Sequence, residues 1–76
     1  MDEKRAAEAM GLLIREMRRE RRLTQTQLAG KTGLSIRQIN NIESGHRPPY
    51  VDEVFLLADG LEVQAWVLTR KLNDLL

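Results

Sequence analysis

Two short helix patterns separated by a glycine-containing turn, within residues 25–44, constrain the fold of this chain most strongly. Thr24 precedes the first pattern and Ser35 precedes the second, and a hydroxyl at either position can accept a hydrogen bond from an unpaired backbone N–H. Gly33 lies between them, and glycine reaches the left-handed conformation without a steric penalty from Cβ. The segment therefore predicts a helix-turn-helix, with its first helix over residues 25–31.

The apolar residues of this segment fall where two crossed helices would bury side chains, at Leu28, Ala29, Leu34, Ile39 and Ile42. Ala29 is small enough to let the second helix approach the first closely. Steps of three and four relate the residues on the other face of the second helix, which are Ile36, Arg37, Asn40, Asn41 and Ser44. This polar face is the one that would enter a groove of DNA.

The residue types on this face suit readout of the major groove. Arginine can bond to guanine through two N–H groups, asparagine can bond to adenine in the same way, and an exposed isoleucine can contact a thymine methyl group. A face that is merely solvated is the alternative interpretation, because most surface helices are polar on one side. The candidates for base readout are Ser35, Ile36, Arg37, Asn40 and Asn41.

Several stretches of the chain together resemble the lambda-repressor-like helix-turn-helix domains, of the Cro/repressor or XRE type. The resemblance covers Ile14 to about Val67, and it rests on IREMRRERRLTQTQLA, the Gly33-Leu34-Ser35 turn, INNIESG and the helix pattern over residues 49–61. It implies an all-α, compact bundle of about five helices that binds operator DNA, normally as a two-fold dimer.

The resemblance also implies roles for particular residues. Arg18 is expected to form a partly buried ion pair with Glu43, tying the first helix to the third. Arg22 departs from the family pattern, which often has a left-handed glycine there; it either adopts that conformation or the helix ends by another geometry. Contacts to DNA phosphates are expected from the start of the second helix and from the loop after the third, at Arg22, Thr24, Gln25, Ser44, His46 and Arg47. A solvated loop is the alternative for the last three.

Composition narrows the function classes. A chain of 76 residues has room for one small core, so we expect a single domain over residues 1–76. The absence of cysteine and the presence of only one histidine, His46, argue against a metal site, a disulfide framework and a nucleophilic catalytic pair. No apolar run approaches the ~18 residues of a membrane span, and no signal peptide pattern opens the chain. We therefore expect a cytoplasmic protein that is not an enzyme, with no cofactor and no small-molecule substrate.

Charge is distributed unevenly along the chain, although the net charge is only +1. Residues 15–47 carry +5, whereas residues 48–76 carry −3 and the first fourteen carry −1. A basic region around the helix-turn-helix would orient the molecule on a polyanion and steer its approach.

Three further helices are predicted around the motif. The first covers residues 1–22, with an apolar stripe of Ala6, Met10, Leu13, Ile14 and Met17. The fourth covers residues 51–59 and ends at Gly60, with Tyr50 at a position where family members usually have a serine or threonine cap. The last helix begins near residue 64 and continues a stripe of Leu61, Ala65, Leu68, Leu72 and Leu75, with Trp66 alongside. That stripe indicates either a dimer interface, made by Trp66, Leu68, Leu72 and Leu75, or packing against the first helix.

The sequence thus predicts a homodimeric transcriptional regulator that binds a pseudo-palindromic operator in double-stranded DNA. A phage repressor, a restriction-modification controller and an antitoxin all fit. The alternative from another class is a protein-interaction module that uses this fold to hold a toxin or an RNA polymerase subunit.

Overall fold

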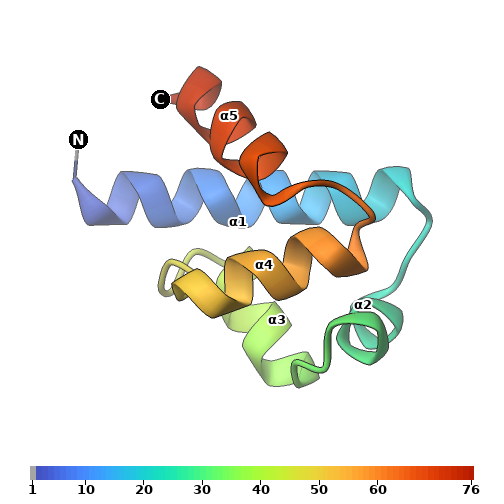
Figure 1. The fold of residues 1–76 in the computed structure, drawn as a ribbon. Helices are drawn as coiled ribbons and strands as arrows, with labels where there is room; N and C mark the ends of the chain where they lie inside the picture. Colours follow the sequence, from blue (N-terminus) through green and yellow to red (C-terminus); the bar gives the residue numbers. More distant parts are fainter. Residues whose placement is uncertain (1) are drawn as a thin grey trace.

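Five α-helices and no strand form the described part of the chain, residues 2–76, in the computed structural model of the protein (Figure 1). The helices are α1 (Glu3–Glu20), α2 (Gln25–Thr32), α3 (Ile36–Glu43), α4 (Val51–Gly60) and α5 (Ala65–Leu75). Helix α1 crosses the middle of the molecule, with α5 on one side and α2, α3 and α4 on the other (Figure 1). The predicted all-α fold is confirmed.

The two central helices begin with the caps that the sequence predicts, and each cap is reciprocal. The Thr24 hydroxyl accepts a hydrogen bond from the backbone N–H of Gln27 at 3.0 Å, while the side-chain oxygen Oε1 of Gln27 accepts one from the backbone N–H of Thr24 at 2.8 Å. Ser35 and Gln38 repeat the arrangement at 3.0 and 2.8 Å. Between the helices, Gly33 has φ +80°, so the turn uses the left-handed conformation that favours glycine.

Helix α1 ends at Glu20, two residues before the predicted end at Arg22. Arg22 has φ +55°, and the N–H of Leu23 bonds back to the carbonyl of Arg18 at 3.1 Å. The chain therefore uses the left-handed ending with a residue that has a Cβ, at a cost of ~1–2 kcal/mol relative to glycine. The predicted start of this helix at Met1 lies outside the described residues.

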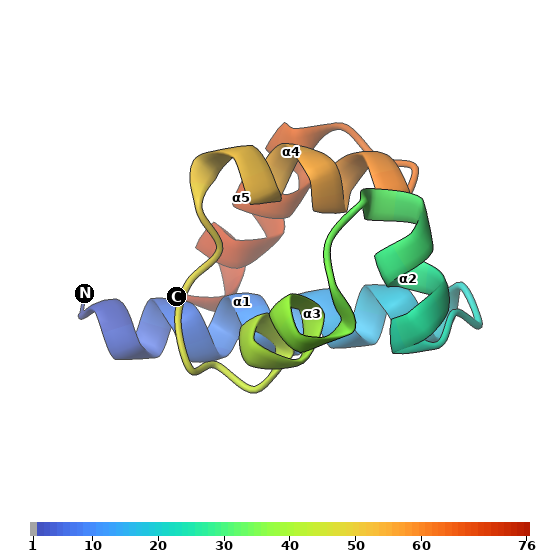
Figure 2. The same ribbon diagram turned by 90° about the horizontal axis from the view of Figure 1, so that it is seen from below.

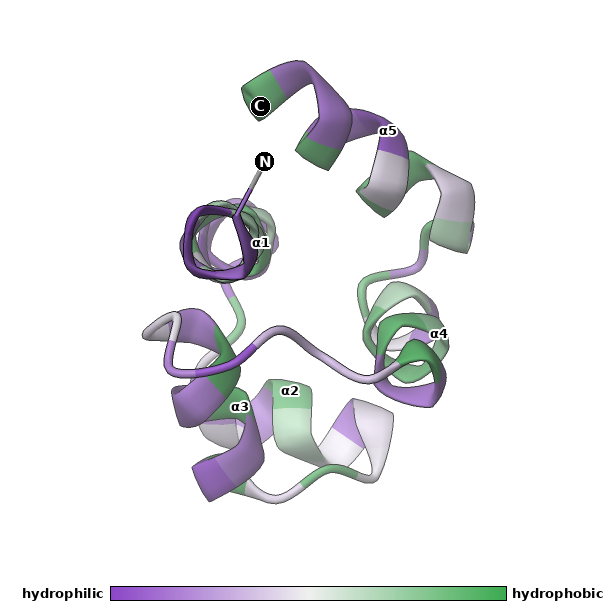
Figure 3. Ribbon diagram, turned by 90° about the vertical axis from the view of Figure 1, so that its left-hand side faces the viewer, coloured by the Kyte–Doolittle hydropathy of each residue, from purple (hydrophilic) through white to green (hydrophobic). Residues whose placement is uncertain are grey.

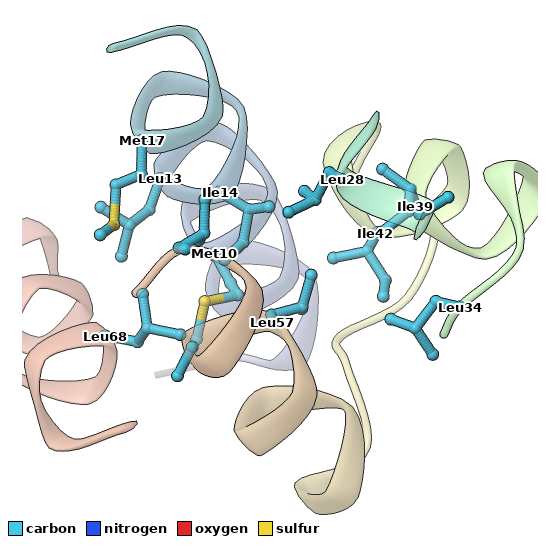
Figure 4. Close-up of a cluster of buried hydrophobic side chains, with 13 residues drawn as sticks. Met10, Leu13, Ile14, Met17, Leu28, Leu34, Ile39, Ile42, Leu57 and Leu68 are labelled. Carbon is cyan, nitrogen blue, oxygen red and sulfur yellow. The ribbon is translucent and has the colours of Figure 1, made fainter. Parts of the chain in front are cut away.

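Side chains from every helix meet in one core (Figure 4). The fully buried large residues are Ile14, Leu28, Ile39, Ile42, Leu57, Leu61 and Leu68. On α1 the buried stripe includes Ala7 in place of the predicted Ala6, which is only partly buried. Burial of these apolar side chains is the main favourable contribution to folding, since the chain has no cysteine to form a disulfide.

Helix α5 completes this core by packing against α1 and α4. Leu68 is fully buried within the monomer, so it cannot supply the dimer contact that was one of its two predicted roles. Leu72 is half-buried against the same core, whereas Trp66 and Leu75 are exposed. The stripe thus belongs mainly to the monomer, because its central residues face α1.

Gly11 lies in the middle of α1, where glycine normally weakens a helix. A Cβ built on it would lie 2.4 Å from the carbonyl oxygen of Ile42 and 2.7 Å from that of Glu43. The missing side chain therefore lets the carboxyl end of α3 approach the α1 backbone directly.

We expect Gly11→Ala to lower the free energy of unfolding by ~1–3 kcal/mol, because backbone atoms of α3 would have to shift. Gly30→Ala is the control, since Gly30 is also helical and its Cβ would meet nothing within 4 Å. That variant should gain ~0.5–1 kcal/mol from helix propensity. Urea unfolding of both variants would measure the difference, and equal effects would show that the helix contact is not tight.

Candidate nucleic-acid interface

The outer face of α3 presents polar side chains to solvent. Ser35, Ile36, Arg37 and Asn40 are exposed, whereas Asn41 is half-buried. Within residues 2–76, no acid lies within salt-bridge distance of the Arg37 guanidinium. Figure 3 shows most of α3 as hydrophilic. Four of the five predicted base-reading side chains are thus exposed, although the Ser35 hydroxyl also accepts the capping hydrogen bond from Gln38 N.

A buried carboxylate holds this helix in place from behind. Glu43, at the end of α3, accepts two hydrogen bonds from Arg18, from Nε at 2.7 Å and from Nη2 at 2.9 Å. The Glu43 side chain is fully buried and the Arg18 side chain nearly so. The hydrogen bonds that Arg18 donates to Glu43 raise the pKa of Arg18 above its ordinary value, although burial opposes this. The pair implied by the resemblance is therefore present, and it connects α1 to α3.

Glu43 has further partners beyond Arg18. The Gln25 side chain donates from Nε2 to Glu43 Oε1 at 3.2 Å, and Arg15 Nε lies 3.7 Å from the same oxygen. Arg18 also donates from Nη1 to the carbonyl of Leu23 at 2.8 Å. One carboxylate therefore connects α1, α2 and α3, which fixes the angle at which α3 projects.

The start of α2 keeps unpaired backbone donors. The Gln25 amide group faces Glu43, and the Thr24 side-chain oxygen accepts the capping hydrogen bond. The N–H groups of the first two residues of α2 have no acceptor within the helix. Each N–H in an α-helix bonds to the carbonyl four residues earlier, and for these two residues that carbonyl lies before the helix begins. A phosphate contact at Gln25 would therefore use its backbone N–H, where the helix dipole also favours an anion.

The two arginines before α2 have different roles. Arg21 donates from Nε to the carbonyl of Leu61 at 2.7 Å and from Nη1 to that of Met17 at 3.1 Å, so it connects α1 to the end of α4. Arg22 is exposed, with its backbone in the left-handed region. Only Arg22 is therefore placed for an outside ligand.

The loop between α3 and α4 corrects one prediction. The Arg47 guanidinium donates to both carboxylate oxygens of Glu53, from Nη1 at 2.7 Å and from Nη2 at 2.9 Å, and it also donates to the carbonyl of Pro48 at 3.1 Å. Its guanidinium carbon lies 4.5 Å from the centre of the Tyr50 ring. Arg47 therefore pairs within the molecule, because its positive charge compensates the buried carboxylate of Glu53. The predicted contact of Arg47 with a DNA phosphate is not supported, since its guanidinium is already paired.

Ser44 and His46 remain at the surface of this loop. The Ser44 hydroxyl donates to the carbonyl of Asn41 at 3.1 Å, and the N–H of His46 bonds to the same carbonyl. The loop leaves α3 and runs to the start of α4, as Figure 2 shows. Both side chains thus extend the polar surface beyond the end of α3.

Glu53 is a site residue that the sequence analysis did not identify. It is 3% exposed, and its carboxylate also accepts from Tyr50 N at 2.8 Å and from Gln38 Nε2 at 3.3 Å. The hydrogen bond from Arg47 is the largest cause that holds the pKa of Glu53 below its ordinary value, and burial opposes it. The available sequence signal was its place three residues after the cap position Tyr50, which favours the hydrogen bond with Tyr50 N but does not indicate the pair with Arg47.

No cluster of three or more histidine, cysteine, aspartate or glutamate side chains suited to a metal ion occurs within residues 2–76. In the same range, no helix has the length and apolarity needed to cross a bilayer.

Comparisons with known proteins agree on one family. A helix-turn-helix family model matches residues 14–65. The solved structure of the wild-type restriction-modification controller protein C.Esp1396I has a TM-score of 0.82 at 29% identity, covering 91% of this chain and 90% of that chain. The controller protein C.AhdI from Aeromonas hydrophila has a TM-score of 0.77 at 27% identity, covering 87% of this chain and 94% of that chain. No curated protein sequence matched.

We expect Glu43→Ala to destabilise the fold by ~3–5 kcal/mol, because it leaves the buried charge of Arg18 unpaired. For a domain of this size the melting temperature should then fall by more than ~10 °C. Glu16→Ala removes an exposed acid from α1 and should change the melting temperature little. Thermal melts followed by circular dichroism would compare them, and similar melting temperatures would mean that the Glu43 pair is solvated.

Proposed function

The chain belongs to the XRE-type helix-turn-helix family of DNA-binding transcriptional regulators, and we propose that it binds a pseudo-palindromic operator as a homodimer. The observation that carries this proposal is the unpaired, exposed Arg37 near the start of α3, on a helix that a buried ion pair holds in place. A rigid helix with a free guanidinium meets the requirement for reading guanine in the major groove.

Base readout is assigned to the exposed face of α3. Arg37 and Asn40 supply the donors and acceptors that read base edges, and Ile36 supplies an apolar surface for a thymine methyl group. Ser35 lies at the start of the same face, and Asn41 reaches only its edge because it is half-buried.

Phosphate contacts are assigned to the flanks of α3. On one side lie Arg22 and the free N–H groups at the start of α2, and on the other side lie Ser44 and His46 in the loop. Arg47 is excluded from this set because Glu53 neutralises it. The excess positive charge of residues 15–47 would still orient this face toward DNA.

A dimer interface is assigned to an exposed apolar surface between α4 and α5, which we call the α4–α5 patch. Its main residues are Val51, Phe55 and Trp66, which are 75%, 62% and 59% exposed. They border a hollow of about 340 Å³ that Val54, Ala65 and Thr69 also line. Figure 3 shows that α4 is largely hydrophobic. Exposed aromatic side chains grouped in this way are typical of protein interfaces.

The occupant we propose for the patch is a second copy of the chain. A two-fold axis through the patch would pair identical surfaces, and each Trp66 could enter the hollow of the other subunit. The predicted contribution of Leu72 and Leu75 is then secondary, because Leu72 is half-buried in the monomer and Leu75 lies at the other end of α5.

Among the biological settings that fit the sequence, we infer that of a restriction-modification controller. The two similar solved proteins are both named as such controllers, and they match over most of their own length. Dimerisation would make occupancy of the operator depend steeply on the concentration of the protein.

We expect Arg37→Ala to weaken binding to a DNA duplex selected from a random pool by ~1–3 kcal/mol, with a smaller effect on random-sequence duplex. Lys71→Ala is the control, because Lys71 is an exposed cation on α5, which lies across α1 from α3. Fluorescence anisotropy titrations would measure both affinities. An equal loss on selected and random duplex would contradict base readout by Arg37.

We expect Trp66→Glu to weaken the dimer by about 30-fold or more, because buried aromatic residues dominate interface energy. Leu75→Glu makes the same change at the other exposed apolar residue of α5 and should leave the dimer largely intact. Sedimentation velocity would report the assembly state, with circular dichroism to confirm folding. Dissociation of the Leu75 variant alone would place the interface at the end of α5.

A further inference from the structure

We propose that Glu53 is a positioning residue for DNA recognition, and this inference rests on the function proposed above. Glu53 is on α4 and touches none of the proposed base or phosphate contacts. Its single carboxylate instead holds both the beginning of α3 and the loop that follows α3.

The link to the beginning of α3 runs through Gln38. The Gln38 side-chain carbonyl accepts from the N–H of Ser35 at 2.8 Å, and its amide nitrogen donates to Glu53 Oε2 at 3.3 Å. A rotation of the Gln38 amide would exchange its oxygen and nitrogen and would break both hydrogen bonds. Glu53 thereby fixes the orientation in which Gln38 caps α3, at the residues next to Arg37.

The link to the loop runs through Arg47 and Tyr50. Glu53 Oε1 accepts from Arg47 Nη1 at 2.7 Å and from the N–H of Tyr50 at 2.8 Å. The same Nη1 donates to the carbonyl of Pro48, so the arginine holds the loop backbone on one side and the carboxylate on the other. The paired hydrogen bonds with both Glu53 oxygens fix the plane of the guanidinium as well as its position.

Burial makes this arrangement selective for a carboxylate. Glu53 is 3% exposed, and its two oxygens together accept four hydrogen bonds from three residues. A side-chain amide in its place would have one acceptor oxygen, and its nitrogen would face donors instead of acceptors. Substitution therefore loosens the start of α3 and the loop together, while the core beneath them is unchanged.

The test compares Glu53→Gln with Asp52→Asn. Both variants remove one negative charge from the first turn of α4, but Asp52 is exposed and makes none of these contacts. The difference between them isolates the hydrogen bonds of Glu53 from its charge. Gln38→Ala is a third variant, which removes the link to α3 while keeping the pair between Arg47 and Glu53. If Glu53→Gln does not fold, a Gln38→Ala variant that discriminates selected from random duplex as well as the unmodified protein overturns the positioning role.

Two measurements are made on each variant. Amide hydrogen exchange in the free protein should become about fivefold faster at Ser35 and Gln38 in Glu53→Gln, as expected for a weakened cap. The ratio of affinities for selected and random-sequence duplex should fall about fivefold in the same variant. Asp52→Asn should leave both quantities as in the unmodified protein.

The outcomes separate this inference from the proposed function. If the unmodified protein binds selected and random duplex equally, the proposed function is wrong and the positioning role falls with it. If it discriminates between them, but Glu53→Gln matches Asp52→Asn in exchange and in affinity ratio, only the positioning role of Glu53 is overturned.

Discussion

The rest of the structure depends on one buried carboxylate, that of Glu43. A charge removed from water has to be compensated inside the protein, and here the compensation comes from Arg18 on α1 and Gln25 on α2. Any other angle between α3 and α1 would leave the carboxylate or the arginine without a partner. Gly11 permits the contact, because the α3 backbone reaches α1 where no side chain intervenes. The direction in which α3 projects is therefore fixed by electrostatics and by close packing together.

The helix-turn-helix could be predicted from the sequence because its determinants are local. The caps at Thr24 and Ser35 and the left-handed Gly33 involve partners within four residues, so their chemistry is visible in the order of the chain. The pairing of Arg47 with Glu53 could not be predicted in that way. It depends on which side of α4 faces the loop, and a glutamate in the first turn of a helix has the same sequence context whether it is exposed or buried. The α4–α5 patch was predicted only in part for a similar reason, since Trp66 is exposed but Leu68 is buried once α5 docks on α1.

Two arginine–glutamate pairs in a small domain have different surroundings and different effects. Arg18 and Glu43 lie behind α3, whereas Arg47 and Glu53 lie beside it and connect to its first turn through Gln38. Each pair brings two segments together and uses both carboxylate oxygens. Together they leave Arg37, which no described acid contacts, as an available cation on the outer face of α3. Arg18 and Arg47 are thus neutralised by buried carboxylates, whereas Arg37, the proposed base-reading arginine, has no acidic partner among the described residues.

The packing of α5 against α1 has a consequence for the synthesis of the protein. Leu68 belongs to the same buried core as Met10 and Leu13, which lie more than fifty positions earlier in the chain. While the ribosome still holds α5, those side chains have no cover, and the helices that carry the DNA-binding face rest on an incomplete core. We expect the nascent chain to remain loosely folded until α5 can pack against α1. Because α5 carries Trp66 as well as Leu68, the chain would complete its core and form the α4–α5 patch in the same step.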